Sequence, residues 1–277
     1  MDKFLYGCIY LSAAIAVSVL LMIICYVTVR GIGSVSLEFL TTVTSARKGT
    51  VGIAGNIVNT LYIIVITLVI ATPIGVGSAI YLNEYAKPGK IVRIIEFTTE
   101  TLSGIPSIIF GLFGSVFFGT TLKLGYSLLT GALTLSLMIL PLITRNTQEA
   151  LRTVPDSYRS GALGMGATKW HMIRIILLPS AMPGIITGVI LAIGRIVGES
   201  AALLFTAGSG YLLPKAGGWL SKILQPGGTL TIQLYLSSSK AEYNVAFGIA
   251  FVLLVIVLCI NFLTKYLAKR FDVTRMK

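Results

Sequence analysis

Long runs without charge are the feature that most constrains this chain. The first extends from Phe4 to Val29 without a charged residue, and roughly 20 apolar residues are enough to cross a bilayer. In the whole chain 55% of residues are hydrophobic and 12% are charged, with a mean hydropathy of +0.88, whereas about a quarter of the residues of soluble domains are charged. The sequence therefore predicts a membrane protein and excludes soluble, disordered and disulfide-stapled domains.

Six apolar runs are candidate transmembrane helices, because a backbone in lipid must satisfy its hydrogen bonds internally. Their approximate bounds are 4–29, 56–81, 94–120, 126–144, 181–205 and 243–264. Pro73 and Pro141 fall inside two of these spans and predict kinks. The predicted fold class is an all-α membrane protein, with residues 1–277 forming a single transmembrane domain.

Basic residues are divided unequally between the two sides of the membrane. Six spans put both termini on one side, which holds 14 of the 22 Lys and Arg residues, against seven on the other. Because cytoplasmic loops are enriched in Lys and Arg, both termini are predicted to be cytoplasmic. The longest cytoplasmic segment is then about 146–180, and the longest external segments are about 30–55 and 207–242. The net charge of +12 is thus a topology signal, and no nucleic-acid partner is predicted.

The cytoplasmic segment has the local signals of two short helices joined by a bend. Pro155 and Asp156 suit a first helical turn, where a missing N–H costs nothing and a negative charge meets the helix dipole. Gly166 tolerates a positive φ in the turn, and Thr168 can cap a second helix. Pro179 is predicted to end that helix.

The second helix of this hairpin would carry Trp170, Ile173 and Ile176 or Leu177 on one side. A compact helical hairpin with an exposed Trp suits docking into a groove of a soluble partner. The alternative is a basic amphipathic loop that lies on anionic lipid headgroups.

This segment resembles the coupling loop of binding-protein-dependent ABC importer permeases, whose pattern is Glu-Ala-Ala, three residues, Gly, nine residues, Ile, any residue, Leu-Pro. The matching positions in this chain are Ser160, Gly161, Ala162, Gly166, Ile176, Leu178 and Pro179. The spacing is kept, while the leading Glu-Ala is Ser-Gly. The resemblance implies a six-helix type I importer permease (MetI-like) fold, with two cytoplasmic ATPase subunits docking on the hairpin and its Trp170.

Two charged residues, Arg195 and Glu199, lie inside the fifth apolar run. Each costs about 2.5–3.5 kcal/mol at the centre of a membrane helix, so partners or a watery cavity are expected. At i and i+4 they are predicted to share a helical face and to pair. Small-xxx-small spacing predicts close helix packing in the same span, at Gly184, Gly188, Gly194 and Gly198.

Two interpretations of this pair remain open. In the first, the ion pair only locks helix packing. In the second, Arg195 attracts a phosphate-like oxyanion while Glu199 keeps the binding weak enough for release. The run 194–208 resembles the fifth-span signature of high-affinity phosphate permease subunits, where the matching Arg and Glu are implicated in transport. The run 103–114 also resembles that family, and the short N-terminus is more similar to its second permease subunit.

That resemblance implies an ATP-driven phosphate importer of the plasma (inner) membrane. Its implied partners are a homologous permease subunit, a dimer of cytoplasmic ATP-binding subunits, an external phosphate-binding protein and the phosphate ion. This chain would bind no cofactor, since ATP and Mg²⁺ belong to the ATPase subunits. Permeases for phosphonate, molybdate or sulfate and an ion-coupled secondary anion transporter remain alternatives, because two charges define a charge type only.

The remaining polar residues give weaker signals. The sequence has no catalytic triad and no metal-ligand cluster, so a non-catalytic subunit is predicted. Arg93, Glu96 and Glu100 fall on one helical face, where Arg93 and Glu96 are predicted to pair, as an interfacial anchor or gate contact. Hydrogen bonds across helices are expected in the second span, from Asn56, Asn59 and Thr60.

Overall fold

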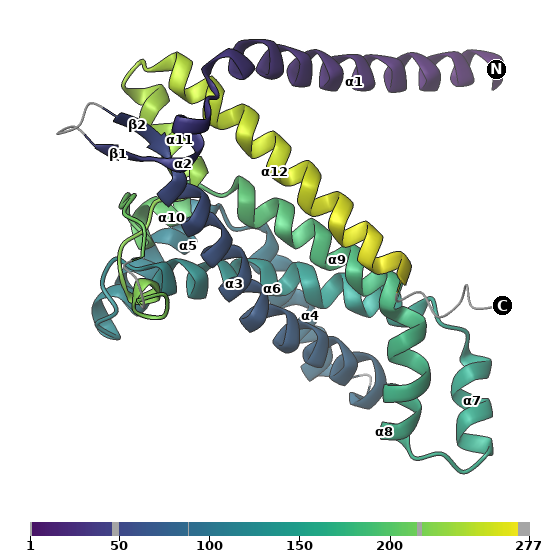
Figure 1. The fold of residues 1–277 in the computed structure, drawn as a ribbon. Helices are drawn as coiled ribbons and strands as arrows, with labels where there is room; N and C mark the ends of the chain where they lie inside the picture. Colours follow the sequence, from purple (N-terminus) through teal and green to yellow (C-terminus); the bar gives the residue numbers. More distant parts are fainter. Residues whose placement is uncertain (1, 46–49, 88, 215–217, 271–277) are drawn as a thin grey trace.

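The computed structural model describes residues 2–45, 50–87, 89–214 and 218–270. It is a bundle of long helices with a small two-stranded ribbon at one end (Figure 1). The long helices are α1 (Asp2–Gly31), α3 (Ala54–Ile80), α4 (Lys90–Gly104), α5 (Ser107–Gly114), α6 (Leu128–Arg152), α9 (Leu178–Gly198) and α12 (Tyr243–Arg270). Five helical segments are long and apolar enough to cross a membrane, or six if α4 and α5 with its extension count as one.

Short elements close the two ends of the bundle. The hairpin end carries α7 (Asp156–Gly164), α8 (Lys169–Met172) and two π-helical turns, η2 (Tyr81–Tyr85) and η4 (Ile173–Leu177). The loop end carries η1 (Ile32–Ser34), α2 (Leu37–Thr41), α10 (Ala201–Thr206), η5 (Ser221–Leu224), α11 (Leu230–Ser239) and η3 (Ser115–Thr121), which extends α5. The ribbon pairs β1 (Val43–Ser45) antiparallel with β2 (Thr50–Ile53) at the loop end.

The central helix of the bundle is α6, which packs against both α3 and α9. Its side chains Leu135, Ile139 and Ile143 are fully buried. Two glycines of α9 allow the close approach. A Cβ on Gly184 would lie 2.5 Å from the Cβ of Ala150, and one on Gly188 would lie 2.7 Å from the Cβ of Asn146. The predicted packing role is therefore confirmed for these two glycines.

The first helix, α1, stands apart from the bundle (Figure 1). It touches α12 near its own C-terminal end, where the ring of Tyr26 lies edge-on to Phe247 with 5.6 Å between ring centroids. The membrane-length part of α1 is exposed in this single chain. Its apolar surface is therefore available to lipid or to another membrane helix.

The prediction of one continuous third span over 94–120 was wrong. The axes of α4 and α5 differ by 101° at a break of two residues, Ile105 and Pro106. Proline has no N–H to continue the helix and forces the preceding residue to an extended conformation. Ile105 accordingly has φ −72° and ψ 131°.

The fifth span was also misplaced. Helical structure runs without a gap from Lys169 through η4 into α9, so Pro179 does not end the hairpin helix as predicted. Pro179 sits in the first turn of α9, where a proline is tolerated. At the other end α9 stops at Gly198, and α10 begins separately at Ala201.

Gly188→Ala tests the contact between α6 and α9. The added Cβ overpacks the contact with Asn146, which costs about 1–3 kcal/mol, so the purified permease should unfold at a lower temperature in detergent. Gly77→Ala in α3 is the matched control, because nothing within the described residues lies within 4 Å of a Cβ at that exposed position. Equal melting temperatures for the two variants would contradict this packing.

Candidate functional site

The hairpin forms at the positions that its local signals predicted. Pro155 precedes α7, and Asp156 lies in the first turn of that helix. Gly166 has a φ of +83° in the bend. The hydroxyl oxygen of Thr168 accepts a hydrogen bond from the backbone N–H of His171 at 3.3 Å and so caps α8. The predicted hairpin of two short helices is confirmed.

The hairpin has its own small hydrophobic core, which is continuous with the end of α6. Ala162 of α7 packs there with buried residues of α8 and η4. The buried members of this cluster are Ala150, Leu151, Val154, Ala162, Met172, Ile173, Leu177, Ala181 and Ile185. Ile176 and Leu178 are partly buried against it. These motif positions therefore hold the hairpin together.

The remaining motif positions face outward. Ser160 and Gly161 are exposed on α7, and Trp170 keeps 59% of its surface exposed. Trp170 thus points away from Ile173, which is fully buried, and does not share a side with it as the periodicity suggested. Ile173 opens a π-helical turn, in which i→i+5 hydrogen bonds place more residues in each turn, so the 3.6-residue periodicity does not hold there.

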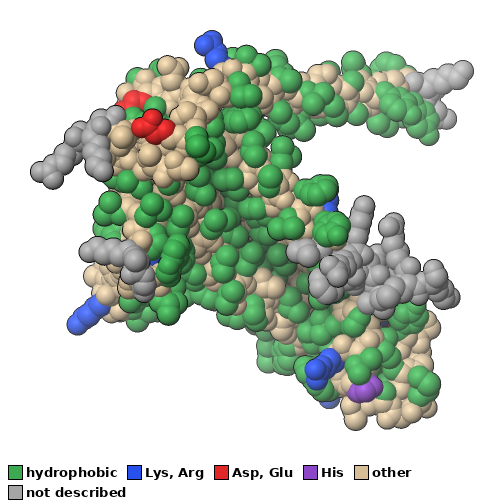
Figure 2. Space-filling model, viewed as in Figure 1, with side chains coloured by type: hydrophobic (Ala, Val, Ile, Leu, Met, Phe, Trp, Pro, Cys, Tyr) green, Lys and Arg blue, Asp and Glu red, His purple; other side chains and the backbone are tan. Residues whose placement is uncertain are grey.

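An apolar surface results at the tip of the hairpin. Tyr158, Leu163, Met165 and Trp170 are each about half exposed or more. Figure 2 shows hydrophobic side chains at this end beside the single histidine, His171. Exposed apolar side chains grouped in this way indicate a site of protein contact.

Arg159, directly before the motif, anchors the hairpin to the bundle. Its guanidinium contacts Glu84 Oε1 through both Nε, at 3.3 Å, and Nη2, at 3.0 Å. It also donates to the carbonyl oxygens of Leu151 and Val154, each at 2.9 Å, and to Asp156 Oδ1 at 3.0 Å. The Glu84 side chain is 5% exposed. One side chain thus joins η2, the end of α6 and α7.

The second helix of the hairpin, α8, is held by the same π-helical turn, η2. The Lys169 ammonium lies over the ring of Tyr85, 4.9 Å from its centroid, within the range of a cation–π interaction. The Asn83 amide donates to Glu84 Oε1 at 2.7 Å. This anchor could not be predicted from the sequence, because Glu84 and Arg159 are 75 residues apart and no local pattern links them.

The predicted ion pair between Arg195 and Glu199 does not form. Glu199 has an extended backbone beyond the end of α9, and its Oε1 accepts the N–H of Ala202 at 3.0 Å at the start of α10. Its carbonyl oxygen accepts a hydrogen bond from Thr231 at 2.9 Å. Within the described ranges no carboxylate lies in ion-pair distance of Arg195. The break after Gly198 removes the i, i+4 geometry on which the prediction depended.

Arg195 is exposed near the C-terminal end of α9, beyond the contacts that Gly184 and Gly188 make with α6. Thr187 and Leu191 are exposed on the same face. Gly194 and Gly198 also lie there, and a Cβ added at either position would meet nothing within 4 Å. The predicted close packing at these two glycines is therefore not made by any of the residues that the structure describes. This part of α9 therefore presents the charged side chain of Arg195 beside an uncovered surface formed by Gly194 and Gly198.

Polar side chains at the start of α3 hold the loop end together. Asn56 donates to the carbonyl oxygen of Gly228 at 2.9 Å, and Asn59 donates to that of Gly210 at 3.0 Å. Thr60 accepts the N–H of Leu230 at 3.0 Å. The expected hydrogen bonds thus reach the 207–230 loop rather than a neighbouring membrane helix.

Lys222 belongs to the same loop and is buried. Its Nζ donates to the carbonyl oxygen of Pro226 at 3.3 Å. Burial lowers the pKa of the Lys222 ammonium below its ordinary value, because the charged form loses water. The free energy of unfolding should therefore rise with pH as the pH passes from the lowered pKa towards 10.5.

The role of Glu199 as a cap can be separated from its charge. Glu199→Gln keeps an oxygen acceptor for the Ala202 N–H, whereas Glu199→Ala removes it at a cost of about 0.5–2 kcal/mol. Hydrogen exchange of the amides in α10 should accelerate in the alanine variant and stay close to wild type in the glutamine variant. Similar acceleration in both would refute the cap.

Comparisons with known proteins agree with this architecture. The sequence model of the family described as "Binding-protein-dependent transport system inner membrane component" matches residues 71–273. The chain is 41% identical over 207 residues to the "Probable ABC transporter permease protein YqgI" of Bacillus subtilis, covering 75% of this chain and 70% of that one. It is 32% identical over 267 residues to the "Phosphate transport system permease protein PstA" of Haemophilus influenzae, covering 95% and 92%.

Solved importers share the fold at low sequence identity. A chain of the inward-facing MetNI methionine ABC transporter aligns with a TM-score of 0.60 at 22% identity, over 79% of this chain and 94% of that chain. A chain of a bacterial alginate ABC transporter aligns with a TM-score of 0.71 at 14% identity, over 98% and 96%. The fold is that of type I importer permeases, as predicted. The chain belongs to the family of inner membrane components of binding-protein-dependent transport systems: it is a multi-pass, non-catalytic ABC importer permease, which works with separate ATPase subunits and a binding protein.

Proposed function

We propose that this chain is a permease subunit of an ATP-driven phosphate importer and forms half of its translocation pathway. The observation that carries the proposal is Arg195, a charged side chain exposed on an open face of a membrane-length helix. A charged side chain in contact with lipid costs free energy, so such residues face a water-filled path or a partner residue. A guanidinium offers forked N–H donors that match the oxygens of phosphate. Relatives named phosphate permeases support this choice of cargo.

The orientation and partners follow from this proposal. The hairpin end and both termini lie in the cytoplasm, where basic loops are retained. Two ATPase subunits dock on the apolar tip of the hairpin, and a homologous permease subunit covers the open face of α9 around Gly194 and Gly198. A phosphate-binding protein delivers the ion at the loop end. Glu199 then acts on the pathway through α10, which it caps, rather than by pairing with Arg195.

Uptake of labelled phosphate tests the cargo and Arg195 together. In cells that lack the gene, the wild-type chain should restore uptake at low external phosphate, and Arg195→Gln should reduce it tenfold or more. The reason is that a hydrogen bond to a charged group contributes roughly 1.5–3 kcal/mol. Lys240→Gln, which removes an exposed positive charge at the loop end, is the control.

The competing cargoes are outcomes of the same assay. Excess sulfate, molybdate or phosphonate should leave phosphate uptake unchanged. Deletion cells that take up phosphate normally, or uptake of another oxyanion in its place, would overturn the phosphate assignment. All variants must first be present in the membrane at equal amounts.

Docking of the ATPase subunits on the hairpin and anchoring of the hairpin to the bundle can be tested with separate variants. Trp170→Ala should leave the melting temperature unchanged and weaken retention of the ATPase subunits during purification by about 30-fold, since a buried interface Trp can contribute 2 kcal/mol or more. Arg159→Met should lower the melting temperature, because it leaves Glu84 buried without its partner at a cost of about 3–5 kcal/mol. Adding Glu84→Gln to Arg159→Met should recover part of that loss. Unchanged ATPase retention in Trp170→Ala would count against this docking surface.

A further inference from the structure

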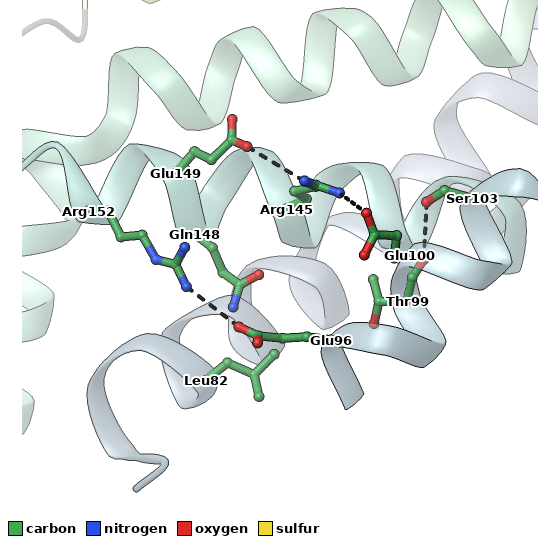
Figure 3. A pocket seen from close by; sticks show the side chains of 9 residues that line it. All are labelled: Leu82, Glu96, Thr99, Glu100, Ser103, Arg145, Gln148, Glu149 and Arg152. Carbon is green, nitrogen blue, oxygen red and sulfur yellow. Dashed lines mark hydrogen bonds and ion pairs between the residues drawn. The ribbon is translucent and has the colours of Figure 1, made fainter. Parts of the chain in front are cut away.

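A polar cleft lies between α4 and α6 at the hairpin end (Figure 3). Its volume is about 250 Å³. Its lining comprises Leu82, Glu96, Thr99, Glu100, Ser103, Arg145, Gln148, Glu149 and Arg152. Eight of these nine side chains are polar, in a chain that is only 12% charged. Such a concentration of charge between membrane helices indicates a hydrated functional site.

The amphipathic helix α4 is oriented with its polar face towards α6. Glu96 and Glu100 point at α6 (Figure 3), while Ile91, Ile94 and Phe97 are exposed. A membrane helix that turns its polar side inward and its apolar side outward borders lipid on the outside and a hydrated space on the inside. The gap between the two helices is therefore a place where an ion can be accommodated.

The ion pairs that line the cleft, two between α4 and α6 and one within α6, are long. Arg145 lies 3.6 Å from Glu100 and 3.6 Å from Glu149, and Arg152 lies 3.5 Å from Glu96. Charge-assisted hydrogen bonds are typically about 2.7–2.9 Å, so these guanidinium groups keep donor capacity for another acceptor. The predicted pairing of Arg93 with Glu96 is not made, since Glu96 faces Arg152 instead.

Gln148 supplies an independent indication of a ligand. It is 9% exposed and lines the cleft, and its Nε2 has no hydrogen-bond partner within the part of the chain that the structure describes. Buried N–H donors are nearly always satisfied by an acceptor. The missing partner is thus an acceptor, which favours an anion over a metal cation.

The geometry points to a transient oxyanion site in the α4–α6 cleft, in which an oxyanion takes the place of Glu96 and Glu100 as the partner of Arg152 and Arg145 and accepts from Gln148. On the proposed function, the ligand is the transported phosphate at its last contact before release into the cytoplasm. Three carboxylates oppose two guanidiniums, so the affinity is low. Low affinity is what an exit site requires.

Occupation of the cleft also changes how α4 is held. The two cross-helix ion pairs are the charged contacts that tie α4 to α6 within the described residues. An anion bound to Arg145 and Arg152 releases both glutamates, whose side chains are 71% and 46% exposed and can turn to water.

Charge-selective labelling tests this site without measuring transport. Ser103, which is exposed in the cleft, is replaced by Cys in a chain where Cys8, Cys25 and Cys259 are Ser. The assembled transporter, in inverted vesicles of neutral lipid, is treated with an anionic sulfonatoethyl or a cationic trimethylammonium-ethyl thiosulfonate. We expect inorganic phosphate to slow labelling by the anionic reagent severalfold, because both anions compete for the guanidinium groups of Arg145 and Arg152, and to slow labelling by the cationic reagent less.

Three variants test whether protection by phosphate depends on the residues that line the cleft. Arg145→Gln with Arg152→Gln should abolish protection by phosphate and lower the rate of the anionic reagent relative to that of the cationic one. Gln148→Leu, which changes no charge, should weaken protection severalfold and leave the ratio of the two rates unchanged. Arg93→Gln, on α4 but outside the cleft lining, should change neither. Retention of the ATPase subunits checks that each variant is assembled.

The outcomes separate this inference from the choice of cargo. Protection by no oxyanion would overturn the site even if the chain imports phosphate. Protection by sulfate or molybdate but not by phosphate would support the site and overturn the phosphate assignment. Slower labelling in vesicles with anionic lipid, together with no effect of soluble phosphate, would assign the donors to a lipid headgroup and overturn the exit site.

Discussion

The guanidinium of Arg159 is the contact on which the geometry of the hairpin end depends. It is the point at which the ends of α3 and α6 and the start of α7 meet, and its five donors are shared between a buried carboxylate, a surface carboxylate and two backbone carbonyls. No other side chain type offers this fan of donors. Because the hairpin core is small, the hairpin is held to the bundle by this charged junction as well as by apolar packing.

The spans and the hairpin could be predicted from sequence because their signals are local. Hydropathy is summed residue by residue, and Pro155, Gly166 and Thr168 each act on their own turn of chain. The helix break at Pro106 could not be predicted in this way, because α6 continues through Pro141 with the same local chemistry. Whether a membrane proline breaks a helix depends on which neighbours satisfy the freed backbone groups.

The charged sites were only partly predictable for a related reason. Arg195 and Glu199 were identified correctly as unusual residues of a membrane segment, but their pairing assumed an unbroken helix. Glu84 and Arg152 gave no signal, since each acquires its partner from a helix distant in sequence. Sequence spacing predicts contacts along one helix, whereas the cleft and the anchor are made between helices.

The anchor also defines what can be exchanged between relatives. A coupling hairpin is a short, continuous stretch of sequence and invites transplantation into another permease to change its ATPase partner. Here the hairpin is matched to Glu84 and Tyr85, which belong to a different membrane helix. The natural module for building chimeric importers is therefore discontinuous: it comprises the hairpin together with η2, the π-helical turn that follows α3. Recombination that separates the two divides one structural unit.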